Sequence, residues 1–224
     1  MDKKQKKSTA AAKNGRTRDR ILDEAETLFA RKGYHGVSVR EITGAAGCNL
    51  AAVNYHFGNK QNLYLEVFRS RWLPRASQVN ESFRRTLKAN GEITPATGIQ
   101  SLAQAFLDGP PTDSERKRHH QLISGELAQP TEAFELVADQ VLQPLFNRLL
   151  DDLQAAMPGE KDGEQLALNA FSILAMVLYF NLARPFISRF TGYAIDDNFK
   201  ARLVNHIVNF SLRGLSDKSK EARR

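Results

Sequence analysis

The chain has 224 residues, of which 42% are hydrophobic and 25% are charged, and its formal net charge is +7. This length and balance predict a soluble, globular protein that can bury a core of its own. Residues 1–20 are almost wholly polar or alanine, which excludes a signal peptide there, and polar residues and a proline interrupt the most apolar stretch, at 166–187. We therefore expect a cytoplasmic protein with no membrane partner.

The positive charge is concentrated in the first third of the sequence. Residues 1–71 hold 14 Lys and Arg residues with 7 Asp and Glu residues, whereas the rest of the chain is electrically balanced. A basic module joined to a neutral one predicts that the first part meets a polyanion and that the second part does something else. The alternative explanation of this positive charge is a basic disordered tail at residues 1–16, because residues 1–20 alone hold 8 basic and 2 acidic residues.

Two helices are predicted directly after this tail. The apolar residues that follow Thr17 repeat at helical spacing, so we expect Thr17 to cap a helix that Gly33 ends. Ser38, with Glu41 three residues later, has the sequence of a capping box and predicts the start of a second helix.

A third and a fourth helix follow at short spacing. Gly47 separates the second helix from a third at 50–57, which Asn49 caps and Gly58 closes. This spacing is typical of a helix-turn-helix unit. Lys60 begins the fourth helix, and a proline at position 74 is expected to bend or end it.

The rest of the chain is expected to be helical, without a convincing strand. The predicted domains are a basic disordered tail at 1–16, a DNA-binding domain at 17–71, a ligand-binding and dimerisation domain at 72–215 and a charged tail at 216–224. The predicted later helices lie at 96–107, 115–127, 132–157, 163–190 and 196–212.

The third helix has the composition of a DNA-reading helix. On a helical wheel Val53 and Phe57 point to one side, whereas Ala51 and Tyr55 point to the other. Small side chains permit close approach to a groove wall, and Asn, Tyr and His can bond base edges and phosphates. The alternative is an ordinary amphipathic helix with a polar outer face.

Two stretches, ILDEAETLFARKGYHGVSVREIT and AAGCNLAAVNYHFGNKQNLY, resemble the DNA-binding domain of TetR-type transcriptional regulators. The resemblance covers residues 17–68, and the stretch at 182–185 is similar to a subgroup with a poorly characterised C-terminal domain. It implies an all-α fold, in which an N-terminal three-helix DNA-binding domain is joined by a long helix to a larger helical domain. It also implies a sequence-specific DNA-binding regulator of transcription, in particular a repressor that responds to a small-molecule effector bound in the C-terminal domain.

The resemblance also implies roles for individual residues. Arg40 is expected to read a base edge, whereas Ser38 and Lys60 are expected to bond phosphates. Leu50 and Asn54 depart from the pattern of many relatives, so the base preference cannot be transferred. The DNA-contacting residues are predicted to be Ser38, Arg40, Asn49, Leu50, Ala51, Ala52, Asn54, Tyr55, His56 and Lys60.

The neutral part is expected to bind a partner copy and an effector. Helices near 166–190 and 196–212 are predicted to form a homodimer, because symmetric operators are read by paired helix-turn-helix units. An effector cavity between helices is predicted to be lined by Trp72, Phe106, Phe134, Met176, Tyr179 and Phe180, although most of these are expected to be plain core residues.

The sequence contains no recognisable catalytic motif, so we expect neither a catalytic role nor a cofactor. Cys48 is expected to pack beneath the turn and not to act as a redox sensor. His119 and His120 are expected on a solvated helix face, and no metal site is predicted. The alternative function is a small-molecule carrier with a vestigial helix-turn-helix.

Overall fold

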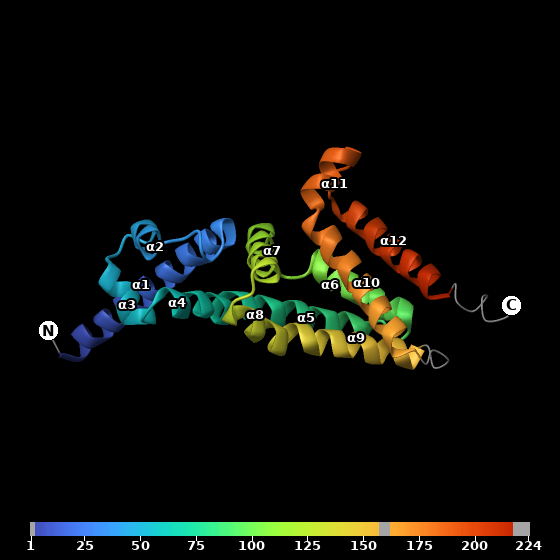
Figure 1. Cartoon of the computed structure of the whole chain (residues 1–224), viewed down its shortest axis with the longest axis horizontal. Helices are drawn as coiled ribbons and strands as arrows, with labels where there is room; N and C mark the ends of the chain where they lie inside the picture. Colours follow the sequence, from blue (N-terminus) through green and yellow to red (C-terminus); the bar gives the residue numbers. More distant parts are fainter. Residues whose placement is uncertain (1–2, 157–161, 217–224) are drawn as a thin grey trace. The chain divides into compact units, whose positions relative to one another are not determined.

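The computed structural model describes residues 3–156 and 162–216, and these two ranges contain helices and no strand (Figure 1). The all-α prediction is therefore confirmed. The α-helices are α1 (Lys3–Lys32), α2 (Val39–Ala45), α3 (Leu50–Phe57), α4 (Lys60–Val67), α5 (Leu73–Ala89), α6 (Pro95–Asp108), α7 (Asp113–Ala128), α8 (Glu132–Val137), α9 (Gln143–Ala156), α10 (Gly163–Leu182), α11 (Arg184–Thr191) and α12 (Asp197–Ser216). Two π-helical turns, η1 (Phe68–Trp72) and η2 (Ala138–Leu142), precede α5 and α9.

The chain divides into two compact units. Unit 1 comprises Met1–Arg75 and Thr112–Ala138, and unit 2 comprises Ala76–Pro111 and Asp139–Arg224. The segment Thr112–Ala138, which the sequence analysis places in the C-terminal domain, thus belongs to the same unit as the helix-turn-helix. Within unit 1, α7 contacts α1 and α8 contacts α4.

The first helix is longer than the sequence analysis expects. α1 begins at Lys3, so residues 3–16, predicted as a disordered tail, continue the helix, and Thr17 lies inside it. The expectation that Thr17 caps the helix is therefore wrong. Alanine and lysine, which dominate this stretch, are among the best helix-forming residues and need no cap at position 17. Gly33 follows the last turn with a φ of 71°, as expected of a C-terminal glycine.

The helix-turn-helix follows the predicted capping chemistry. The Ser38 side chain accepts a bond from the backbone N–H of Glu41, and the Glu41 carboxylate accepts one from the N–H of Ser38, so the capping box is present. The Asn49 side chain accepts a bond from the N–H of Ala52 at 3.0 Å and caps α3. Gly47 has a φ of 59°, a backbone conformation that turns the chain between α2 and α3 at little cost for glycine.

Proline 74 does not end the fourth helix. The helical run continues from α4 through η1 into α5, with Pro74 in the first turn of α5. Because proline lacks a backbone N–H and its ring crowds the preceding turn, the wider π-turn directly before it accommodates both effects. The same pattern recurs at η2, where Pro144 is the second residue of α9.

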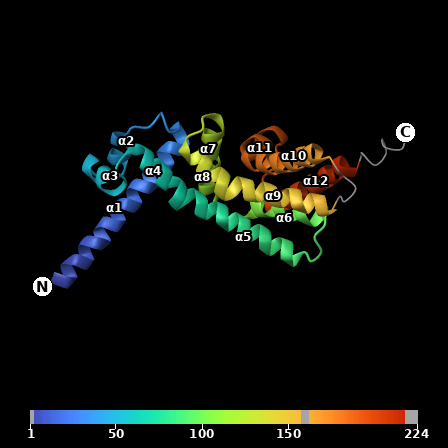
Figure 2. The same ribbon diagram turned by 60° about the horizontal axis from the view of Figure 1, so that its bottom comes forward.

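Unit 2 is a helical bundle in which α12 packs along α6, and α10 packs against α6, α9 and α12 (Figure 2). Its core includes fully buried side chains such as Ile99, Leu102 and Ile207. The single helix predicted at 163–190 is divided into α10 and α11 at Ala183. A proline in the first turn of α11 cannot donate a backbone N–H to the preceding turn, which explains the break.

Candidate nucleic-acid interface

The predicted reading helix presents the expected two faces. Val53 is completely buried and Phe57 is 8% exposed, so these two side chains anchor α3 to the core of unit 1. On the opposite side Tyr55 is 74% exposed, whereas Leu50, in the first turn of α3, is 46% exposed. The wheel-based prediction of the buried face is thus confirmed.

Within unit 1 the predicted DNA-contacting residues lie on α2 and α3, at the N-caps of these helices and at the start of α4. Figures 1 and 2 both show α2 and α3 beside α1 and α4. Ala52, His56 and Lys60 are partly buried. The exposed members of the set are Ser38, Arg40, Asn49, Leu50, Ala51, Asn54 and Tyr55.

The hydroxyl of Ser38 is already engaged in the free protein. It donates to the Glu41 carboxylate at 2.9 Å, and the backbone N–H of Ser38 donates to the same carboxylate at 2.7 Å. Lys32 also bonds Glu41 at 2.7 Å. These bonds, with that from Lys32 the largest influence, lower the pKa of Glu41 to about 2. A phosphate contact by the Ser38 hydroxyl would therefore compete with the capping box.

Lys60 lies against an aromatic ring that the sequence analysis does not identify. Its ammonium nitrogen lies 4.4 Å from the centroid of the Tyr34 ring, a cation–π distance. Partial burial lowers the pKa of Lys60. The Tyr34 ring in turn packs against Tyr64, with the ring centroids 4.8 Å apart. The sequence signal for this contact is only the Lys-Gly-Tyr stretch that ends α1.

A second missed residue, Arg18, supports the end of α3. Its guanidinium pairs with the Glu66 carboxylate of α4 at 2.5 Å and lies 5.5 Å from the centroid of the Phe57 ring. Ser70 donates a further hydrogen bond to Glu66 at 2.6 Å. Arg18 therefore links α1 to the two helices that follow the turn.

A buried ion-pair cluster joins α1, α5 and α7 within unit 1. Glu26 of α1 is 2% exposed and accepts two hydrogen bonds from Arg75, one of them at 3.3 Å. Arg118 of α7 reaches the same carboxylate at 3.3 Å. Glu115 lies 3.5 Å from Arg75 on the other side. The segment Thr112–Ala138 is thus tied to α1 by charge as well as by packing.

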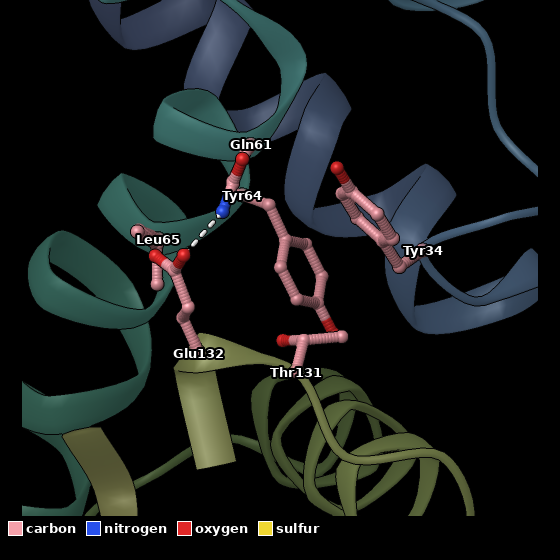
Figure 3. Close-up of a pocket in the computed structure, with 6 residues that line it drawn as sticks. All are labelled: Tyr34, Gln61, Tyr64, Leu65, Thr131 and Glu132. Carbon is pink, nitrogen blue, oxygen red and sulfur yellow. Dashed lines mark hydrogen bonds between the residues drawn. The ribbon is translucent and has the colours of Figure 1, made fainter. Parts of the chain in front are cut away.

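A second polar connection joins α4 to the start of α8. The buried Tyr64 hydroxyl donates to Glu126 at 2.6 Å, and the backbone N–H of Thr131 donates to Glu126 at 2.9 Å. Burial and the Glu126 carboxylate raise the pKa of Tyr64. Gln61 donates to Glu132 at 2.6 Å (Figure 3).

These residues surround a small pocket of about 260 Å³ in unit 1 (Figure 3). Figure 3 shows the rings of Tyr34 and Tyr64 side by side, with Gln61 and Glu132 joined across the other side. The pocket is lined by Tyr34, Gln61, Tyr64, Leu65, Thr131 and Glu132. None of the six predicted effector-contacting residues is among them.

Those six residues are divided between the two units. Trp72 and Phe134 belong to unit 1, and Trp72 is 2% exposed. In unit 2, Tyr179 is 67% exposed. The members that pack partly buried against the unit 2 core are Phe106, Met176 and Phe180. The predicted cavity lining remains a prediction.

The histidine pair lies differently from its expected solvated position. His120 is 8% exposed, and the His119 ring stacks on Trp72 with centroids 4.1 Å apart. The indole N–H of Trp72 donates to the backbone carbonyl of His119 at 3.0 Å. The expectation of a solvated face is wrong because this side of α7 packs against Trp72 and other residues within unit 1. Among the residues of the two described ranges, no group of His, Cys, Asp and Glu has the arrangement of a metal site.

Two protein families match the sequence. The family described as "Bacterial regulatory proteins, tetR family" matches residues 21–67. The domain described as "HTH-type transcriptional dual regulator CecR, C-terminal domain" matches residues 97–215, which is more than half of the chain. The HTH-type transcriptional dual regulator CecR of Shigella flexneri is 26% identical over 219 residues, covering 92% of this chain and 96% of that protein.

Solved structures share the fold. A TetR-family transcriptional regulator from Bordetella parapertussis has a TM-score of 0.63 at 20% identity, covering 87% of this chain and 93% of that one. The structure of AibR in complex with isovaleryl coenzyme A and operator DNA has a TM-score of 0.61 at 18% identity, covering 87% and 97%. The fold of this chain is therefore similar to that of experimentally determined structures.

Proposed function

Because this chain belongs to the TetR family of transcriptional regulators and carries a CecR-type C-terminal domain, we propose that it acts in the cytoplasm as a homodimeric repressor. Its biochemical function is sequence-specific DNA binding in the regulation of transcription. In the proposed form, two copies of α3 read one operator, and a small-molecule effector bound by the C-terminal domain changes the affinity for that operator.

The observation that carries this proposal is the division of α3 into an anchored face and a free face. Val53 and Phe57 fix the helix to unit 1, so the exposed Asn54 and Tyr55 can enter a groove without loss of packing. Arg40 on α2 is exposed beside them and suits guanine, whose O6 and N7 accept a bidentate arginine. Asparagine suits adenine in the same way.

Lysine, tyrosine and histidine near the ends of α3 suit the phosphate backbone. Lys60 carries a positive charge at the first turn of α4, and the hydroxyl of Tyr55 is exposed. We assign Lys60, Tyr55 and His56 to phosphates. The small side chains of Ala51 and Ala52 allow the start of α3 to approach the groove wall.

The proposed dimer surface is the exposed apolar face of α10 with its neighbours in unit 2. α10 is long and apolar enough to cross a membrane by length and composition, yet only 33% of its most apolar window is buried within one chain. A partner copy that covers this face explains the composition, because large apolar patches mark interaction sites. The exposed residues are Leu168, Phe171, Tyr179 and Leu182 on α10, Phe186 and Phe190 on α11, and Phe210 on α12.

An effector of small-molecule type is supported by the family of the C-terminal domain and by AibR, whose structure holds isovaleryl coenzyme A together with operator DNA. In this chain the helical run from α4 to α5 is continuous through η1. This run is our candidate for the element that transmits effector binding to the DNA-binding helices. The π-turn directly before Pro74 is a site where such a helix can change its geometry.

The test starts with selection of genomic fragments that bind the full-length protein, followed by affinity measurements on the selected operator. Arg40→Ala should cost about 1–3 kcal/mol on the operator and remove discrimination at one base pair. Lys60→Ala should weaken all DNA similarly and lower the salt dependence by about one released ion. Equal behaviour of the two variants would reject the role assignment.

Transcription from the selected promoters then distinguishes repression from activation. In cells that lack the gene, promoters that the protein represses should become more active. Promoters that become less active would show that it acts as an activator there. Failure to enrich any fragment would contradict the proposed function as a whole.

A further inference from the structure

We propose that Tyr34 is a positioning residue for DNA binding, because its ring holds the Lys60 ammonium in place before the phosphate arrives. This inference rests on the proposed contact between Lys60 and the DNA backbone. Tyr34 itself lies in the turn that follows α1, outside the set of residues expected to touch DNA.

The geometry places the ammonium on the face of a fixed ring. The Lys60 nitrogen lies 4.4 Å from the centroid of the Tyr34 ring, within the range of a cation–π contact. That ring is held from below by Tyr64, at a centroid distance of 4.8 Å, and Tyr64 is 3% exposed. Phe29, which is 1% exposed, lies 6.2 Å from Tyr34 on the α1 side. The Tyr34 ring, which forms the platform for Lys60, is therefore anchored in the core of unit 1.

The anchoring continues through hydrogen bonds. The Tyr64 hydroxyl donates to the buried Glu126 at 2.6 Å, so the Tyr64 ring is fixed by this hydrogen bond as well as by packing. Figure 3 shows the Tyr34 and Tyr64 rings packed together on one side of the small pocket. The Lys60 ammonium, which lies over the Tyr34 ring, therefore has a defined position.

An aromatic platform suits a phosphate-binding lysine better than a carboxylate does. A lysine side chain is long and flexible, and it loses rotamer freedom when it binds. A carboxylate partner would restrict it but would also compete with the incoming phosphate for the same N–H donors. A ring attracts the charge through its face, adds no net negative charge and leaves the donors that point away from the ring available.

The Glu41 carboxylate, whose charge acts on Lys60, forms its hydrogen bonds with other groups. Glu41 acts on Lys60 through its charge, but it bonds Lys32 and the backbone N–H of Ser38, both at 2.7 Å. These bonds hold Glu41 at the corner between α1 and α2. The Tyr34 ring is thus the contact that determines where the Lys60 ammonium rests.

The test is a double-mutant cycle on the full-length protein and a selected operator fragment, with the dissociation constant measured by fluorescence anisotropy. Tyr34→Leu should weaken binding about two- to fivefold, the range expected for an exposed cation–π contact. Tyr34→Phe should bind as the parent does, because phenylalanine keeps the ring face. In a Lys60→Gln background, Tyr34→Leu should have no further effect.

Each contrary outcome has its own meaning. If Lys60→Gln leaves the affinity unchanged, the proposed phosphate contact of Lys60 is wrong. If Lys60→Gln weakens binding but Tyr34→Leu is equally harmful in both backgrounds, Tyr34 does not act through Lys60, and only the present inference is overturned. If Tyr34→Phe is as harmful as Tyr34→Leu, the hydroxyl matters and the ring does not.

A fluorinated ring keeps the test decisive if Tyr34→Leu disturbs the fold. Phenylalanine with ring fluorines at position 34 retains the shape of the side chain but removes the negative face of the ring. It should lower DNA affinity about as much as Tyr34→Leu while unfolding at the same urea concentration as Tyr34→Phe. Equal DNA affinity of the fluorinated and plain phenylalanine variants would overturn the inference.

Discussion

Removing the charge of Glu26 should destabilise unit 1 strongly. Glu26→Gln keeps the shape of the side chain but leaves Arg75 without the carboxylate that pairs with it. The side chains of Glu26 and Arg75 are only 3% and 11% exposed, so water cannot replace the lost partner. The effect should therefore resemble the breaking of a buried ion pair and not that of a surface pair.

The magnitude follows from the two remaining contacts. Removing one partner of a buried pair typically costs about 3–5 kcal/mol. Arg75 retains Glu115 at 3.5 Å, and the Arg118 side chain is 27% exposed and can turn toward water. Both facts reduce the penalty, so we expect a loss of about 3 kcal/mol in the free energy of unfolding of unit 1.

Trp72 provides the assay. It is the only tryptophan in the chain and is 2% exposed within unit 1, so its fluorescence during urea unfolding reports on that unit. Variants are compared at one protein concentration because association also contributes to stability. As a control within unit 1, Asp23→Asn removes a pair with Arg71 at 2.9 Å whose carboxylate side chain is 62% exposed, and should cost less than about 1 kcal/mol.

A second variant separates pairing from burial. Glu26→Leu combined with Arg75→Met replaces the charged pair by apolar side chains and should recover much of the stability, because neither of these two buried charges then remains. The charges that they leave behind, on Arg118 and Glu115, are on side chains that are 27% and 34% exposed and can turn toward water. A loss below about 1 kcal/mol for Glu26→Gln would refute the reasoning, since a buried pair cannot be broken so cheaply. A double variant less stable than Glu26→Gln would refute it as well.

Two further predictions concern pH and association. Burial, with smaller effects of His120 and Arg75, lowers the pKa of His119 from 6.5 to about 3. The unfolded chain then binds the proton more readily, so the free energy of unfolding should fall as the pH drops from about 6.5 toward 3, by at most about 1.4 kcal/mol per pH unit. Urea midpoints from Trp72 fluorescence at pH 7 and pH 5 measure this effect, and it should be absent in His119→Phe. Tyr179→Asp on the proposed dimer face should yield monomers in light-scattering measurements, whereas Ile93→Asp, at another exposed apolar residue, should not; an intact Tyr179→Asp dimer would contradict the proposed surface.

The local chemistry of the helix-turn-helix follows from the sequence alone. Ser38 with Glu41, Asn49 and the glycines at the helix ends act on their own neighbours within three or four residues, so their roles can be recognised without a fold. The helical period likewise identifies Val53 and Phe57 as the buried side of α3, because it fixes which residues share a face.

Only the tertiary structure decides which residues these faces meet. The helical period does not identify the partners of Glu26, which are Arg75 and Arg118. It also does not predict that Lys60 lies over the ring of Tyr34, a residue of the turn that follows α1. It also does not show that the segment Thr112–Ala138 packs with the first helices in one unit, where α7 contacts α1 and α8 contacts α4. Such contacts depend on how distant helices pack, and a pattern with a period of 3.6 residues carries no information about that packing.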